Sequence, residues 1–394
     1  MSADEVFFRE WTARATGSRR DLGRAREMAA ALGAAEAGRP VLTVVGSKGK
    51  GTAAVYASAT LAAAGLRVCT VTSPGLRGNR DRIRVDGRAV AEDAFAALAG
   101  RLEAALPAAP GRGHLSPSGL FTLAGVLHAA DAGADALVLE AGMGGQSDEV
   151  SLYPPLVAAI TPIFAEHLGV LGDSVTEIAA EKAGIVGPGT RAVVAAPQSA
   201  EVARVLAGLD GAGAEPPPAL PAALLPAGLG RDAARTGYGA ALRLLAELGR
   251  PGPAPARLRA VLGSVRLPGR LSWHRAGGTE VLADSAIDRR GVAVALAAAR
   301  ARWGSVDRVL VCLPDHKDLD GAVAELDDLP VTFVRLPQEH LRFERALPAS
   351  WQVVEAADLA LDGLGRHVVA LGTVYFVGRV LELVGADTER LFDV

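Results

Sequence analysis

The chain has 394 residues, of which half are apolar and only 4% aromatic, so it can form two domains with cores of alanine, valine and leucine. The formal net charge is −3 and the basic residues are dispersed, which excludes the electrostatic signature of a nucleic-acid-binding protein. No run of 18 apolar residues indicates a membrane span, and the first residues lack the basic and apolar regions of a signal peptide. We therefore expect a cytoplasmic protein with no nucleic-acid or membrane partner, in which Cys69 and Cys312 are buried free thiols.

Strand-like apolar runs alternate with helical patterns through the first two hundred residues. The expected strands cover residues 41–45, 66–71, 136–139, 156–160 and 192–196. The expected helices cover residues 53–64, 92–105, 120–130 and 174–183. This alternation predicts a P-loop-type, mostly parallel sheet with helices on both faces.

A second α/β pattern follows a change in composition. Proline, glycine and alanine dominate residues 209–230, which we interpret as a surface connection, and a helix is expected over residues 231–249. The later elements are a helix at residues 290–302 and strands at residues 280–283, 308–313, 331–334 and 367–371. We therefore predict a first domain of residues 1–263 and a smaller, Rossmann-like α/β domain of residues 264–394, with a ligand cleft between them.

The segment Gly-Ser-Lys-Gly-Lys-Gly-Thr at residues 46–52 joins the first expected strand to a helix. Backbone N–H groups and the positive helix end of such a turn form an anion cradle, Lys50 adds a full charge, and the Thr52 hydroxyl can face Mg²⁺. The match to the usual nucleotide loop is imperfect, because Val44 stands at its first glycine and Gly51 separates Lys50 from Thr52. We interpret the segment as a phosphate-binding loop, the alternative being an ordinary turn. The residues expected to bind phosphate are Gly46, Ser47, Lys48, Gly49, Lys50, Gly51 and Thr52.

Two further polar residues follow expected strands. Ser73 comes after the second strand and Glu140 directly after the third. Ligands of parallel sheets bind beyond the carboxyl ends of the strands, so both should lie near the phosphate-binding loop. The alternatives are that Glu140 only caps a helix or forms a salt bridge, and that Ser73, before Pro74, only makes a turn.

Nine segments taken in chain order carry a resemblance to a known family. They are GSKGKGT at residues 46–52, TSPGL at 72–76, DRIRVDG at 81–87, EAGMGGQSD at 140–148, ITPIFAEHLGVLGD at 160–173, EKAGI at 181–185, LPGRL at 267–271, DSA at 284–286 and GTVYFVG at 372–378. The first resembles GTNGKGS, the fourth EVGLGGRLD, and the eighth the start of DGAHNP, all motifs of the folylpolyglutamate synthase/dihydrofolate synthase family of the Mur ligase superfamily. The resemblance covers almost the whole chain.

This resemblance implies an ATP-dependent, ADP-forming ligase that activates a carboxylic acid as an acyl phosphate and joins it to an amine or amino acid. Its cofactors would be ATP and Mg²⁺. Lys50 would contact the phosphates, with Thr52 beside them, and Arg270 and Asp284 of the second domain would close over the nucleotide. Nothing in the pattern indicates an oligomeric state.

The same resemblance implies a metal and catalytic set. Thr52, Ser73 and Glu140 would serve a first Mg²⁺, and His167 a second. Lys182 matches a lysine that is carbamylated in the family. From the residues alone, His167 could equally be an ordinary loop histidine and Lys182 a solvated residue at a helix end. We interpret Lys50, Glu140, His167 and Lys182 as the catalytic residues.

The sequence departs from the family mainly where the substrate and base are recognised. Gly75 replaces a histidine, Gln146 an arginine, residues 116–119 lack an acidic residue, and Ile287-Asp288-Arg289 replaces His-Asn-Pro. These changes predict an acid other than folate. The alternatives are a true folylpolyglutamate/dihydrofolate synthase, and a catalytically impaired pseudo-enzyme or partner subunit. The arginines at residues 77, 80, 82 and 84 are interpreted as a solvated loop and strand edge.

Overall fold

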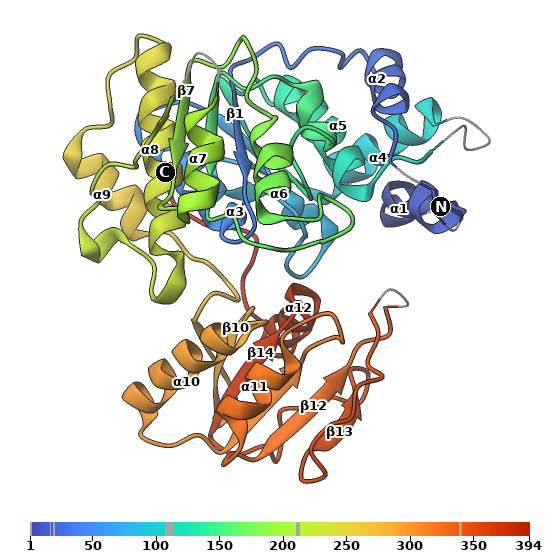
Figure 1. The fold of residues 1–394 in the computed structure, drawn as a ribbon, viewed down its shortest axis with the longest axis vertical. Helices are drawn as coiled ribbons and strands as arrows, with labels where there is room; N and C mark the ends of the chain where they lie inside the picture. Colours follow the sequence, from blue (N-terminus) through green and yellow to red (C-terminus); the bar gives the residue numbers. More distant parts are fainter. Residues whose placement is uncertain (1, 16, 19, 107–112, 210–212, 339–340) are drawn as a thin grey trace.

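A computed structural model describes residues 2–15, 17–18, 20–106, 113–209, 213–338 and 341–394 (Figure 1). These residues form two α/β domains, each built on its own sheet. The predicted fold class is therefore confirmed, whereas the boundary between residues 263 and 264 stays a prediction. Among the described helices, none is long and apolar enough to cross a membrane.

The first sheet is mostly parallel, and its described strands follow the order β4-β3-β2-β5-β1-β6-β7-β8. The strands are β1 (Val41–Val45), β2 (Val68–Val71), β3 (Ile83–Val85), β4 (Arg88–Ala89), β5 (Ala136–Glu140), β6 (Val157–Ile160), β7 (Ala192–Ala195) and β8 (Ala214–Glu215). Antiparallel pairing among the described strands occurs only at one edge, where β3 pairs with both β2 and β4. All five expected strands are present within two residues of their predicted ends. The central strands β1 and β5 are buried along their whole length, which explains their continuous apolar sequence.

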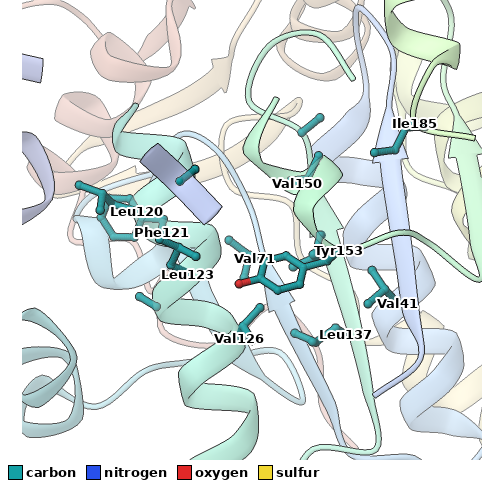
Figure 2. Close-up of a cluster of buried hydrophobic side chains, with 14 of the residues drawn as sticks. Val41, Val71, Leu120, Phe121, Leu123, Val126, Leu137, Val150, Tyr153 and Ile185 are labelled. Atoms are coloured by element: carbon teal, nitrogen blue, oxygen red, sulfur yellow. The ribbon is translucent and has the colours of Figure 1, made fainter. Parts of the chain in front are cut away.

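Helices cover both faces of this sheet. They are α1 (Ala3–Ala13), α2 (Leu22–Ala31), α3 (Lys50–Ala63), α4 (Glu92–Ala105), α5 (Pro117–Asp131), α6 (Val175–Ala183), α7 (Ala200–Ala207), α8 (Arg231–Glu247) and α9 (Pro255–Gly263). The helices α3 and α8 share one apolar cluster with the sheet, and α1, α2, α4, α5, α6 and α7 share another. Figure 2 shows part of the second cluster, where Leu123 and Val126 of α5 lie beside side chains of the sheet. Tyr153 also lies in this cluster, and its hydroxyl donates to the carbonyl of Ala34 at 2.7 Å.

Helix α3 is held rigidly because it is buried on nearly every side. It packs closely on α8, where a Cβ atom on Gly237 would collide with the carbonyl of Ala53. Alanine and glycine therefore let the two backbones approach. The helix begins at Lys50, three residues earlier than expected, so Lys50, Gly51 and Thr52 form its first turn.

The second sheet has the order β13-β12-β11-β14-β10-β9 among the described residues. Its elements are β9 (Ser272–Ala276), β10 (Thr279–Asp284), α10 (Arg289–Trp303), β11 (Arg308–Cys312), α11 (Leu319–Leu326), β12 (Val331–Arg335), β13 (Gln352–Glu355), β14 (His367–Gly372) and α12 (Val374–Leu383). All neighbours are parallel except β9 and β10. The edge strands β9 and β13 escaped prediction because neither is buried along its length, so neither carries a continuous apolar run.

The connection predicted at residues 209–230 lies mostly on the surface, with Leu220 buried. It also contributes the short edge strand β8. Residues 210–212 of this segment lie outside the described part of the chain. Both cysteines are buried, as expected from their apolar surroundings.

The last residues of the chain return to the first domain (Figure 1). The N–H of Ala89 donates to the carbonyl of Glu389 at 2.8 Å. Arg84 donates to the carbonyls of Thr388 at 2.7 Å and Glu389 at 3.1 Å. The prediction of a solvated arginine edge is therefore wrong for Arg84, and also for Arg82, because both are buried.

Candidate active site

The phosphate-binding loop has a backbone that requires glycine at two positions. Gly46 has φ +138°, and a Cβ atom there would collide with the hydroxyl of Thr161. Gly49 has φ +91°, and a Cβ atom there would lie 2.7 Å from that of Ala233. No side chain caps the N-terminus of α3, which follows directly. The first N–H groups of a helix have no intrahelical acceptors, so this end of α3 suits an anion.

Two lysines converge on one carbonyl of this loop. Lys50 Nζ donates to the carbonyl oxygen of Gly46 at 3.0 Å, and Lys182 Nζ donates to the same oxygen at 3.1 Å. Lys182 is 1% exposed and pairs with Glu166 Oε1 at 2.9 Å. Burial lowers the pKa of Lys182, while Glu166 raises it in part. The alternative of a solvated lysine at a helix end is therefore wrong.

Glu140 lies buried at the end of β5, opposite the first turn of α3. Its Oε2 accepts the N–H of Ser73 at 3.0 Å and would lie 3.5 Å from a Cβ atom on Gly51. Burial raises the pKa of Glu140 to about 6, although Lys50, the N–H of Ser73 and Arg270 act against this. A buried carboxylate whose pKa is raised in this way is a candidate for binding a cation, and the metal role of Glu140 stays a prediction.

Arg82 lies on the other side of Ser73. Its Nη1 donates to Ser73 Oγ at 3.3 Å, and its guanidinium lies 4.5 Å from the centre of the Phe121 ring. Burial lowers the pKa of Arg82 to about 10. The neighbouring turn is tight, because a Cβ atom on Gly75 would collide with the carbonyl of Gly78. Glycine at position 75 is therefore required by this loop conformation.

His167 directly follows Glu166, the partner of the buried Lys182. Its Nε2 is 3.9 Å from Glu166 Oε2, and its side chain is 44% exposed. Burial lowers the pKa of His167, with Glu166 acting against this and Lys317 and Lys182 adding to it. Glu166 was not singled out from the sequence, although it directly precedes His167 in a motif that was. Its role becomes visible only once Lys182 is placed.

The second domain faces the loop with three charged residues, Arg270, Asp284 and Asp288. Lys48 Nζ lies 2.8 Å from Asp288 Oδ2. Asp284 Oδ2 accepts the N–H of Leu271 at 2.7 Å, and burial raises its pKa while Arg270 lowers it. Asp284 thus supports the turn that carries Arg270. The nucleotide contacts predicted for Arg270 and Asp284 stay predictions.

The residues near Glu140 fit a Mg²⁺ ion held together with phosphates. The described residues contain no group of three or more His, Cys, Asp or Glu side chains arranged so that they could hold a metal ion. Mg²⁺ bound to a nucleotide needs only one or two carboxylates, and the buried Glu140 beside Ser73 and Thr52 meets this. The surroundings of His167 do not fit a second Mg²⁺, because this hard cation prefers oxygen ligands to imidazole nitrogen and Glu166 already pairs with Lys182. The metal roles of Thr52, Ser73, Glu140 and His167 stay predictions.

An acidic residue does stand at the start of α5, although residues 116–119 supply none. Glu149 Oε1 accepts the N–H of Ser116 at 3.0 Å. A Cβ atom on Gly119 would lie 2.5 Å from the carboxyl carbon of Glu149. Arg20 donates to Glu149 at 3.3 Å and to Asp148 at 3.1 Å. The structure thus places at the start of α5 an acidic residue that the linear motif lacks.

No family model matches the chain. It is similar to the dihydrofolate synthase/folylpolyglutamate synthase of Bacillus subtilis, with 31% identity over 185 residues, which are 46% of this chain and 43% of that protein. The Escherichia coli protein of the same name is 34% identical over 182 residues, 45% of this chain and 42% of the relative. A probable bifunctional folylpolyglutamate synthase/dihydropteroate synthase of Haloferax volcanii is 36% identical over 161 residues, 41% of this chain and 19% of the relative. The alignments therefore span less than half the length of these relatives.

Solved structures match over nearly the whole chain. A Mycobacterium tuberculosis folylpolyglutamate synthase complexed with ADP and AMPPCP superposes with a TM-score of 0.77 and 23% identity, covering 98% of this chain and 100% of that one. The apo form of the L. casei enzyme gives a TM-score of 0.80 with 22% identity, covering 97% of this chain and 99% of that one. At this identity the match establishes the fold, and it agrees with the resemblance found in the sequence motifs.

Proposed function

We propose that this homologue of the folylpolyglutamate synthase/dihydrofolate synthase family is an ATP-dependent, ADP-forming ligase for a carboxylic acid and an amine or amino acid. The observation that carries the proposal is Glu140, buried opposite the uncapped start of α3 and beside Lys50. Joining a carboxylate to an amine in water requires an activated acyl group. A site that gathers positive groups around one buried carboxylate suits the polyphosphate that would supply this activation.

The reaction has two steps. A carboxylate oxygen of the acid attacks the γ-phosphorus of ATP. The bond between this phosphorus and the bridging oxygen of the β-phosphate breaks, ADP leaves, and an acyl phosphate remains. The amine nitrogen then attacks the acyl carbon, loses a proton and expels inorganic phosphate.

The residues serve these steps by holding charge and position. Lys50 and the start of α3 bind the phosphates and offset the repulsion between the two anions. Lys182 and Glu166 hold the carbonyl of Gly46 in place, which orients the loop. Mg²⁺, held by Glu140 with Ser73 and Thr52, would supply further positive charge at the phosphates.

Two identities are possible for the acid, folate or another carboxylic acid. Gly75, Gln146 and Ile287 occupy changed positions and favour an acid other than folate. Two observations favour folate to the same degree. Glu149 supplies an acidic group at the start of α5, and the relatives are named as folate enzymes. Gly46, Gly49 and Lys50 are all present in the turn before α3, which disfavours the pseudo-enzyme.

The test is ADP release from Mg-ATP with panels of acids and amines. Dihydropteroate and tetrahydrofolate, each with glutamate, form one arm, and unrelated carboxylic acids with amino acids form the other. Turnover in the first arm identifies a folate enzyme, turnover only in the second identifies another acid, and Lys50→Ala is the negative control for both. Tight binding of Mg-ATP without turnover in either arm would refute the ligase and leave the pseudo-enzyme.

A further inference from the structure

Two positions that depart from the family motifs meet where the two domains contact each other. Lys48 stands where GTNGKGS has asparagine, and Asp288 stands where DGAHNP has asparagine. They are 240 positions apart in the chain, yet Lys48 Nζ donates to Asp288 Oδ2 at 2.8 Å. Two neutral positions have thus become one ion pair.

Each partner is fixed by its own domain. Asp288 is the N-cap of α10, and its Oδ1 accepts the N–H of Gly291 at 2.7 Å, which leaves Oδ2 for Lys48. Lys48 is part of a loop that is tied to β6, because the N–H of Ser47 donates to the carbonyl of Pro162 at 2.9 Å. The pair therefore joins two rigid elements, the phosphate-binding loop and the start of α10.

Other charges near the pair explain why a positive residue stands opposite Asp288. Asp288 adds a negative charge to a face of the second domain that already carries Asp284. Lys317, also on that face, interacts with both Glu166 and Lys48. Without Lys48, the Asp288 carboxylate would stand unpaired beside the site of a polyphosphate, where it would repel the ligand.

We propose that Lys48 and Asp288 are positioning residues that hold the second domain over the phosphate-binding loop and keep the Asp288 carboxylate from repelling the nucleotide. The second part rests on the proposed function, since it needs nucleotide at this loop. The first part does not, because it depends only on the contact between Lys48 of the first domain and Asp288 of the second.

The test begins with three variants: Lys48→Asn, Asp288→Asn and the double variant. Asparagine caps a helix as well as aspartate does, so Asp288→Asn removes charge and leaves the start of α10 intact. The control is Asp320→Asn, which breaks an exposed ion pair with Arg345 inside the second domain.

The first measurement is the distance between the domains without nucleotide. Fluorescent labels on Glu201→Cys and Arg300→Cys, both at exposed positions, report it by energy transfer, and the native cysteines are buried. Each single variant should broaden the distance distribution, whereas the control should not. In the protein with both residues intact, 1 M salt should broaden the distribution as well, because salt screens the attraction between Lys48 and Asp288. Unchanged distributions in both single variants would overturn the positioning role.

The second measurement is the affinity for Mg-ATP with KM and kcat. Lys48→Asn should weaken Mg-ATP binding about fivefold, which is the upper end of the effect expected for a half-exposed ion pair. The double variant should recover most of the lost affinity. The kcat at saturating ATP should change less than KM, because neither residue touches the reacting atoms. Purely additive losses would contradict the pair. Absence of any nucleotide binding would instead refute the proposed function, while the distance measurement still decides the positioning role.

Discussion

The charge of Glu140 should cost the ligand-free protein stability, and Glu140→Gln should recover it. Burial raises the pKa of Glu140 from 4.5 to about 6. The folded protein therefore binds this proton more tightly than the unfolded chain does, so the ionised carboxylate destabilises the fold above pH 6. The difference corresponds to about 2 kcal/mol of unfolding free energy at pH 7. The cost should shrink as the pH falls below 6 and disappear near 4.5.

The assay is urea unfolding between pH 4.5 and 8 in a chelator, with nucleotide absent. Glu140→Gln should be about 2 kcal/mol more stable than the wild type at pH 7 and equal to it near pH 4.5. The control is Glu10→Gln, because the buried Glu10 pairs with Arg24 at 2.9 Å and accepts the N–H of Leu115 at 2.8 Å. Loss of the Glu10 charge should destabilise the protein by about 3 kcal/mol, since Arg24 is left without a carboxylate partner.

The two variants make the same chemical change and should move stability in opposite directions. Glu140→Gln should also weaken Mg²⁺-dependent nucleotide binding, so stability is gained where function is lost. A destabilised Glu140→Gln, or a gain that does not vary with pH, would refute the assignment of Glu140 as a carboxylate buried for binding.

Three further outcomes are expected. Lys50→Ala should weaken Mg-ATP binding by about tenfold or more in calorimetry with little change in Tm, because Lys50 donates only to the carbonyl of Gly46 among the described residues; equal affinity would contradict the phosphate role. Cys69 and Cys312, whose pKa values burial raises to about 12, should react with a thiol reagent only after denaturation, and rapid native labelling would show that they are accessible. Deleting residues 387–394 should lower Tm because Arg84 loses the carbonyl acceptors of Thr388 and Glu389 and keeps only that of Gly87, and Arg84→Met in the shortened chain should recover part of the loss.

The elements around the phosphate loop could be predicted because their signals are local. The apolar run of β1, the glycines at 46 and 49 and the helix that follows lie within a few residues of one another. Glu140 was placed correctly for the same reason, since the end of a buried parallel strand defines its position. Edge strands such as β9 lack that signal, because partly exposed residues need no continuous apolar sequence.

By itself the sequence determined the alternation of strands and helices, the glycine-rich turn before α3 and the family resemblance, because each depends on neighbours in the chain. Tertiary structure alone decided which distant charges meet. Lys182 with Glu166, Lys48 with Asp288 and Arg84 with Thr388 are set by packing between separate elements. A charge is stabilised or penalised by whatever lies within a few ångströms, and chain order does not specify that neighbourhood.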